Sequence, residues 1–179
     1  MGTRLYFEAH DGSSGYELWA HETTNDSTWQ VADIWSGSGN GLVNGITAMG
    51  TRLYFSAHDG SSGKELWAHE STNSSTWQVA DIYSGANSGV PNGMTVMGTR
   101  LYFQANDGNC PFMVNHQLWV HETTNNSTWP VTDFDTCGWA TSVEIGILVV
   151  GSRFYLNIAD PDYGYELHMV EIDHTVTYS

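Results

Sequence analysis

MGTRLYFSAHDGSSGKELWAHESTNSSTWQVADIYSGANSGVPNGMTV, residues Met49–Val96, decides the fold, because most of the chain repeats it. Residues 1–48, aligned beneath it without a gap, differ at twelve of 48 positions. A third copy keeps MGTRLYF before it diverges, and a fourth, shorter copy begins as VGSRFYL. Self-similarity at a period of this size is typical of solenoids, propellers and arrays. The sequence therefore predicts a single repeat domain, 1–179, with the units 1–48, 49–96, 97–149 and 150–179.

One unit contains four short segments that are typical of β-strands. They are rich in β-branched and aromatic residues, and Asp-Gly, Ser-Gly and Asn-Ser turn sequences separate them. A link rich in Gly, Ser, Asn and Pro leads to the next unit. The pattern predicts an all-β protein with these strands in each unit: Asn44–Gly50, Arg52–His58, Glu65–Glu70 and Thr76–Ile82.

Apolar side chains occur on both faces of these strands. In Arg52–His58, Leu53 and Phe55 point to one side and Tyr54 to the other. A sheet of this kind is covered on both faces. Sheets arranged radially between two neighbours form a β-propeller, here of about four blades. The alternative is a propeller-like linear stack of four-stranded sheets. Repeats of about 40–50 residues with four strands favour the closed propeller.

The number of strands predicts an unpaired sheet edge. The leading strand precedes only the second, third and fourth copies, so either the first sheet lacks this strand or the last sheet lacks its closing one. Unpaired edges are templates for another chain. We therefore expect a homo-oligomer, or a head-to-tail filament, joined through the terminal strands Arg4–His10 and Thr175–Tyr178. Trp35 and Tyr83, in the links, are expected to be better exposed than the strand tryptophans and are the candidate contacts with a partner or a glycan.

The formal charge of −15 is distributed along the repeat and is not concentrated in one segment. Most acidic residues recur at the same repeat positions, and four of the five basic residues form one column: Arg4, Arg52, Arg100 and Arg153. This composition excludes a nucleic-acid partner, which would require clustered basic residues. No apolar run is long enough to span a membrane.

The third and fourth strands carry a family resemblance. ELWAHETTNDSTWQVADI, ELWAHESTNSSTWQVADI and QLWVHETTNNSTWPVTDF resemble the ELWxTDGT-type repeats of secreted and surface proteins from marine and environmental microbes. In that family, LYFxAxDGxxGxELW precedes a turn, a V-x-D-I strand and a Gly/Ser/Pro-rich link. This chain has His-Glu-Thr-Thr where the family has Thr-Asp-Gly-Thr, so its turn differs there. The resemblance covers nearly the whole chain and implies a propeller-like fold and a secreted or surface location.

All N-x-S/T sequons of the chain lie in the same turn of the repeat. They begin at Asn25, Asn73, Asn125 and Asn126. Asn, Ser and Thr are also ordinary turn formers, so a structural explanation stands beside N-glycosylation. The sequon persists while neighbouring residues change between copies, and this persistence favours covalently attached glycans.

The two cysteines lie in the third copy. Cys110 belongs to an insertion, 109–117, and Cys137 follows the last strand of that unit. Their confinement to one unit favours a disulfide in an oxidising compartment over two unrelated buried thiols.

Candidate metal ligands also recur. Asp11, Asp59 and Asp107 sit in Asp-Gly turns beside hydroxyl or amide side chains, so calcium is a candidate ligand, although such turns normally need no ion. The histidines lack the spacing of a zinc site and are expected to be structural. The recurring strand tryptophans are expected to be core residues, with sugar-stacking platforms as the alternative.

The chain contains no nucleophile motif, phosphate loop or isolated carboxylate pair. The sequence therefore predicts a non-enzymatic, extracellular structural protein that self-associates, as a filament or surface-layer unit, and carries glycans. Apart from calcium, no cofactor is expected. The alternative function is a lectin-type propeller with repeated carbohydrate sites.

Overall fold

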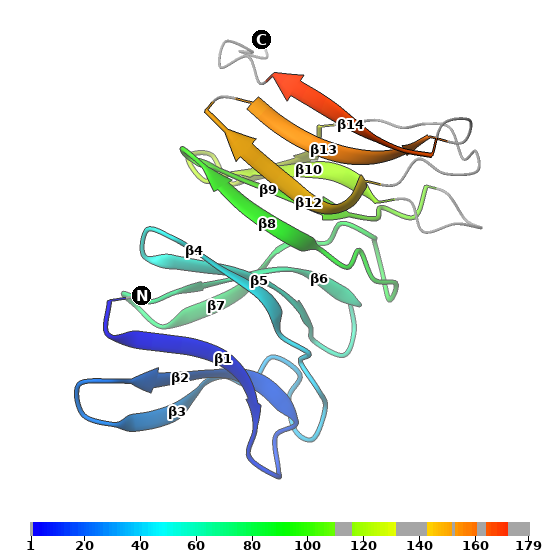
Figure 1. Ribbon diagram of the computed structural model, residues 1–179. Helices are drawn as coiled ribbons and strands as arrows, with labels where there is room; N and C mark the ends of the chain where they lie inside the picture. Colours follow the sequence, from blue (N-terminus) through cyan, green and yellow to red (C-terminus); the bar gives the residue numbers. More distant parts are fainter. Residues whose placement is uncertain (1, 110–115, 132–142, 152, 161–163, 172–179) are drawn as a thin grey trace.

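The computed structural model describes residues 2–109, 116–131, 143–151, 153–160 and 164–171. Within these ranges the chain is all-β, and its fourteen strands form four antiparallel sheets (Figure 1). The strands of the first sheet are β1 (Arg4–His10), β2 (Tyr16–Glu22) and β3 (Ser27–Ala32). The second has β4 (Asn44–Met49), β5 (Arg52–His58), β6 (Lys64–Glu70) and β7 (Ser75–Ala80). The third has β8 (Asn92–Met97), β9 (Arg100–Ala105), β10 (Gln117–Glu122) and β11 (Ser127–Pro130). The fourth has β12 (Val143–Val150), β13 (Arg153–Asp160) and β14 (Gly164–Glu171).

The predicted strands are confirmed, with small shifts at their ends. In the second sheet the chain runs β4-β5-β6-β7 as an antiparallel meander. The fourth strand ends at Ala80, two residues earlier than predicted. The backbone N–H of Ile82 instead donates to the side chain of Glu65 at 2.8 Å, so this residue belongs to the link.

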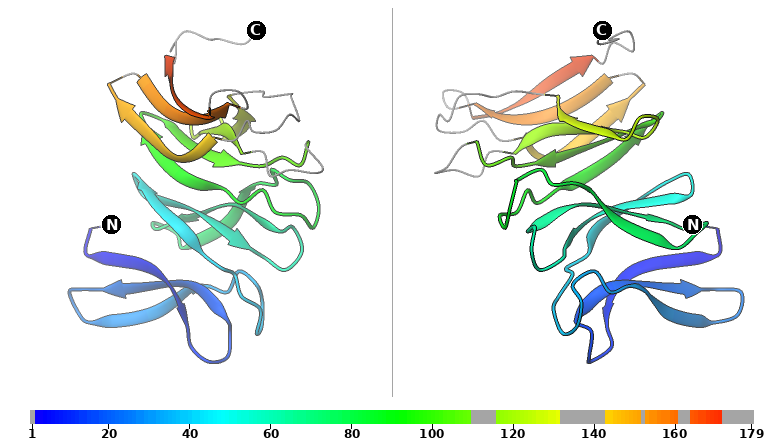
Figure 2. Two further views of the ribbon diagram at one scale, coloured as in Figure 1. Left: turned by 45° about the vertical axis from the view of Figure 1, so that its right-hand side comes forward. Right: turned by 180° about the vertical axis from the view of Figure 1, so that it is seen from behind.

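The sheets follow one another in an open stack. The first and fourth sheets lie at opposite ends in all three views (Figures 1 and 2). Along one side of the stack β4 lies against β8, and β8 against β12. The predicted fold class, a propeller or a propeller-like stack, is confirmed. In the described part of the chain the first and fourth sheets do not meet, so these four sheets do not close into a ring (Figures 1 and 2).

The apolar core lies between the sheets. Between the first and second sheets, Leu18 and Ile34 meet Leu53 and Phe55. Between the second and third, the core comprises Tyr54, Leu66, Ala68, Ile82, Leu101, Phe103, Ala105 and Trp119. The two-sided apolar pattern of each strand therefore has the expected cause, which is contact with a neighbouring sheet on either side.

The unequal number of strands also has its expected consequence. The first sheet has three strands, and no described strand pairs with the outer edge of β1. The described part of the fourth sheet ends with β14. Of the predicted terminal strands, the N-terminal one is β1, and Thr175–Tyr178 lies outside the described residues.

Candidate interaction surface at the ends of the stack

Each sheet has two chemically different faces. We call the face toward the preceding sheet the leading face and the face toward the next sheet the trailing face. In the second sheet, the leading face carries Leu53, Phe55 and Trp67, and the trailing face carries Tyr54 and Leu66. Each contact inside the stack thus joins a trailing face to a leading face, and the two surfaces are not interchangeable.

A histidine lies at each of the first two of these contacts. His69, on the leading face of the second sheet, lies with its ring centroid 5.8 Å from that of Tyr6 in the first sheet. His121 lies in the same way 5.4 Å from Tyr54. Burial lowers the pKa of both histidines, so the neutral ring is the form that the contact favours. His69 and His121 thus pack between successive sheets.

A buried glutamate in each of the first two sheets fixes the link that follows it. Glu65 is fully buried, and its carboxylate accepts the N–H groups of Ile82 at 2.8 Å and Gly89 at 2.6 Å. Glu17 accepts those of Ile34 at 2.7 Å and Gly41 at 2.9 Å in the first unit. Burial raises the pKa of Glu65 to about 7, against the opposing effect of the backbone N–H donors.

The aromatic residues of the links pack onto the next sheet. Trp35 stacks on His58, with ring centroids 4.6 Å apart and an interplanar angle of 16°. The Trp35 indole also lies over Gly60, where a Cβ atom would come within 2.5 Å of Nε1. Tyr83 covers Gly108 of the third sheet in the same way. Both aromatic side chains are half-buried, so they are less exposed than the sequence suggested. Their contact with a partner or a glycan stays a prediction.

No described sheet lies on the leading face of the first sheet. Leu5 is 59% exposed, whereas its counterparts Leu53 and Leu101 are 2% and 0% exposed. His10, in the repeat position of His58, is exposed. A Cβ atom at Gly12 would have nothing within 4 Å. No described residue takes the place of Trp35 above Gly12, and the His10 ring instead contacts that of Tyr16, with centroids 5.1 Å apart.

The fourth sheet exposes apolar side chains at the other end of the stack. Leu167 is 73% exposed, although it occupies the repeat position of Leu66, which is fully buried. Leu148, Val150 and Met169 are 62%, 56% and 51% exposed. The stack thus ends in two apolar surfaces, which correspond to the two sides of its own internal contacts.

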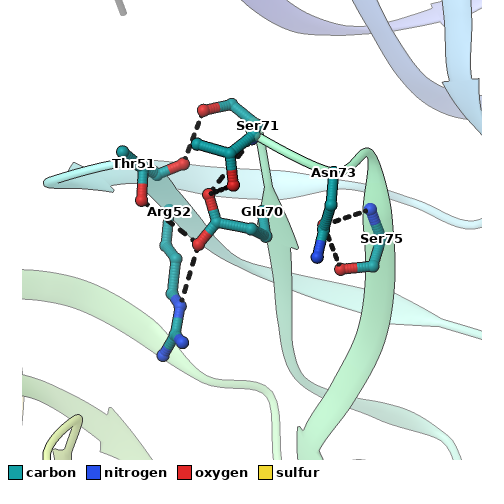
Figure 3. A network of polar contacts seen from close by, with 7 residues as sticks. Thr51, Arg52, Glu70, Ser71, Asn73 and Ser75 are labelled. Carbon is teal, nitrogen blue, oxygen red and sulfur yellow. Dashed lines mark hydrogen bonds and ion pairs between the residues drawn. The ribbon is translucent and has the colours of Figure 1, made fainter.

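The charges that recur along the repeat form local networks. Arg52 Nε lies 3.2 Å from Oε2 of Glu70, which also accepts the hydroxyl of Thr51 (Figure 3). The same ion pair joins Arg4 to Glu22 and Arg100 to Glu122. Each pair joins the first residue of one strand to the last residue of the strand that follows it, so these charges stabilise the hairpins β1–β2, β5–β6 and β9–β10.

The sequon turns lie beside these networks and are exposed. Oδ1 of Asn73 accepts the N–H and the hydroxyl of Ser75 at 3.0 and 2.7 Å (Figure 3). Asn25 and Asn125 make the same contacts with Ser27 and Ser127. The asparagine oxygen thus shapes the turn, and the side chain whose amide nitrogen would carry a glycan belongs to an exposed residue.

The Asp-Gly turns are closed by their own hydrogen bonds. Asp59 accepts the N–H groups of Ser61 and Ser62, both at 2.8 Å. These bonds lower the pKa of Asp59 to about 2, although partial burial opposes them. Asp11 and Asp107 make comparable turns. No group of three or more candidate metal ligands occurs among the described residues, and calcium at these turns stays a prediction.

Two further expectations concern the cysteines and the membrane. Cys110 and Cys137 lie outside the described residues. The described residues include no helix that could cross a membrane.

The sequence assigned no role to the residue before each Asp-Gly turn, and the structure shows that this residue accepts a hydrogen bond from the turn. Nδ1 of His58 accepts the N–H of Gly60 at 2.7 Å, and Oδ1 of Asn106 accepts that of Gly108 at 2.9 Å. The sequence held a signal for this role: the position changes from His to Asn between copies, and both side chains can accept a hydrogen bond from a backbone N–H group.

The fold of this chain is similar to parts of larger proteins of known structure. The fold is similar to TolB from Acinetobacter baumannii, with a TM-score of 0.58, 11% identity and coverage of 97% of this chain and 39% of that one. A putative TolB from Agrobacterium tumefaciens has a TM-score of 0.60, 10% identity and coverage of 96% and 58%. A puromycin hydrolase mutant complexed with PGG has a TM-score of 0.65, 14% identity and coverage of 95% and 25%.

These likenesses establish the class, an all-β protein of the β-propeller type. The chain spans less than two thirds of the length of each of these proteins. No protein-family model and no curated protein matches its sequence. Membership of the ELWxTDGT-type repeats stays a prediction.

Proposed function

We propose that the chain is a non-enzymatic structural repeat protein, secreted or surface-displayed, that associates head to tail. In this assembly the trailing face of the fourth sheet of one copy covers the leading face of the first sheet of the next. This contact joins a trailing face to a leading face, as the contacts within the stack do. Because the two faces differ, the contact is heterologous. Repeated from copy to copy, such a contact produces a ring where the rotation closes and a filament where it does not, and we propose the filament.

One observation carries the proposal. Leu5 and Leu167 are 59% and 73% exposed at opposite ends of the stack, whereas their repeat counterparts inside it are buried. Burying a leucine side chain favours association by about 1.5–3 kcal/mol. The formal charge of −15 opposes association, and this repulsion is screened at high ionic strength.

The decisive experiment uses two variants that each block one end. Leu5→Glu blocks the leading face and Leu167→Glu blocks the trailing face, and both side chains are already exposed. Sedimentation at about 1 M salt, where the screening length is about 3 Å, should give long assemblies of the wild type and monomers of each variant. An equimolar mixture of the two variants should give a dimer, because one intact face of each kind remains.

The control is Leu42→Glu, which adds the same charge at a link residue that is 42% exposed and lies outside both end faces. It should assemble as the wild type does. A monomeric wild type at high salt and high protein concentration would refute the proposal, and so would a mixture of the end variants that stays monomeric.

Glycosylation of the sequon turns is the second part of the proposal. Asn25, Asn73 and Asn125 lie at exposed turns, away from the contacts between the sheets. Glycans at these positions would leave both end faces accessible. The intact mass of protein from its native source should fall on glycosidase treatment. An unchanged mass would remove this part and leave head-to-tail association to be judged separately.

The lectin alternative has less support from the described residues. A repeated carbohydrate site requires an aromatic platform that is open in each unit. Trp67 and Trp119 instead belong to the packing between sheets. A glycan-array screen with the monomeric Leu5→Glu variant would test this alternative without interference from assembly.

A further inference from the structure

We infer that the edge of β1, together with the open leading face of the first sheet, binds an extended segment that supplies the missing link and leading strand. The inference goes beyond the proposed head-to-tail association, because in each copy Asn44–Met49 already pairs with β5, so the segment comes from a further repeat and not from the second sheet of a copy. The segment resembles residues 33–49 of this chain and belongs to a further repeat of the same type. It adds a fourth strand to the first sheet, a form of β-augmentation.

The second and third sheets show how such a segment binds. β4 pairs with β5 in the register Asn44 to Ser56, Thr47 to Tyr54 and Met49 to Arg52. Ahead of β4, the carbonyl of Gly41 accepts the N–H of His58 at 2.8 Å. In the third sheet, the carbonyl of Gly89 accepts the N–H of Asn106 at the same distance. Link and leading strand thus form one continuous docking element.

The same receiving surface recurs in the first sheet, where no described strand occupies it. β1 has the sequence RLYFEAH and β5 has RLYFSAH, so six of the seven side chains are the same. The position above Gly12, which no described residue takes, corresponds to the one that Trp35 fills above Gly60 and His58. Backbone edge and aromatic slot therefore lie in the same relative positions as in the occupied sheet.

The one altered residue fits an added strand of this sequence. Glu8 replaces Ser56, and the register places it opposite the position of Asn44. A carboxylate can accept from the amide of that asparagine. Glu8 also interacts electrostatically with Lys64 of the second sheet, and a charged side chain at a sheet edge discourages pairing with an unselected strand. The site consequently favours this segment over any strand that lacks a donor there.

The test uses a labelled synthetic peptide with the sequence of residues 33–49. It is titrated into the wild-type chain at low salt and at concentrations where sedimentation shows a monomer. Saturable binding is expected, with slower hydrogen exchange of the β1 amides and unchanged exchange in β13. Leu5→Glu in the protein should weaken binding by about tenfold or more, as expected for the loss of one buried leucine. Leu42→Glu, a surface change outside the site, should leave it unchanged.

Two control peptides separate strand pairing from non-specific adhesion. Thr47→Pro removes a backbone donor from the added strand, and Trp35→Ala removes the aromatic ring from the slot. Each should weaken binding by about tenfold or more. Binding that is absent, or equal for all peptides, or accompanied by no protection of β1, would overturn the inference.

The outcome is distinguishable from that of the proposed function. Peptide binding by a chain that stays monomeric at high salt supports the docking site and refutes self-association. Head-to-tail assembly without peptide binding supports the proposed function and refutes the docking site. If both hold, excess peptide should shorten the assemblies, because it competes for the leading face of the first sheet.

Discussion

The first and second sheets have nearly the same sequence and different surroundings. Residues 1–48 and 49–96 differ at twelve positions, and their hairpins have the same register. Leu5 is nevertheless 59% exposed and Leu53 is 2% exposed. The local sequence therefore determines the strands, and the neighbouring sheet determines which of their faces is buried.

The largest expected difference between the two sheets is in how much this leucine contributes to the free energy of unfolding. Leu53→Ala should lower the free energy of unfolding by about 2–5 kcal/mol, because it leaves a cavity between two sheets. Leu5→Ala should change it by no more than about 0.5 kcal/mol, because the side chain already contacts water. Urea denaturation of both variants at low protein concentration measures the difference. Equal losses would mean that another part of the chain covers the first sheet.

The glycines of the Asp-Gly turns offer a second matched pair. Gly12 and Gly60 have φ angles of 95° and 91°, so alanine is strained at both, by about 1–2 kcal/mol. Only Gly60 lies beneath Trp35, and overpacking should add about 1–3 kcal/mol to the cost of Gly60→Ala. Thermal denaturation should show the larger loss for Gly60→Ala.

A double variant tests the cause of that difference. In the background of Trp35→Ala, the costs of Gly60→Ala and Gly12→Ala should become similar, since the residue above Gly60 is then small. A cost of Gly60→Ala that does not depend on residue 35 would show that the indole is not the source of the strain.

The buried glutamates predict a pH dependence that differs between the two units. Burial raises the pKa of Glu65 from an ordinary value of 4.5 to about 7. Its contribution to stability is therefore fully present below about pH 4.5 and is lost as the pH rises to about 7. Relative to Glu65→Gln, the wild type should lose stability across this window.

The comparison with the first unit sharpens this prediction. Burial also raises the pKa of Glu17, but the first sheet is covered by another sheet on its trailing side only. Glu17→Gln should change the pH dependence in the same direction and by less. Urea midpoints measured from about pH 4.5 to 7.5 provide the test. Parallel curves for the wild type and Glu65→Gln would show that this carboxyl does not titrate in the window.

The sequence alone was sufficient for the strands and insufficient for the ends of the stack. Turn dipeptides and two-sided apolar strands predicted the meanders because these features act within a unit. Whether the sheets close into a ring depends on the angle between successive sheets, which no residue pattern states. The exposure of Trp35 was misjudged for a related reason, because its contact with His58 joins two units.

The smallest expected effect concerns the links between the sheets. Leu42 and Val90 occupy the same link position with φ angles of 49° and 48°, a region that disfavours β-branched residues most. Their side chains are 42% and 39% exposed, so replacement by asparagine removes little buried apolar surface. Asparagine tolerates this conformation, and it keeps the N–H of residue 90 that donates to the carbonyl of Lys64 at 2.9 Å. Val90→Asn should therefore stabilise the chain by about 1 kcal/mol, and Leu42→Asn by less. Melting temperatures of the two variants give the comparison, and a larger gain for Leu42→Asn would show that β-branching is not what strains the second link.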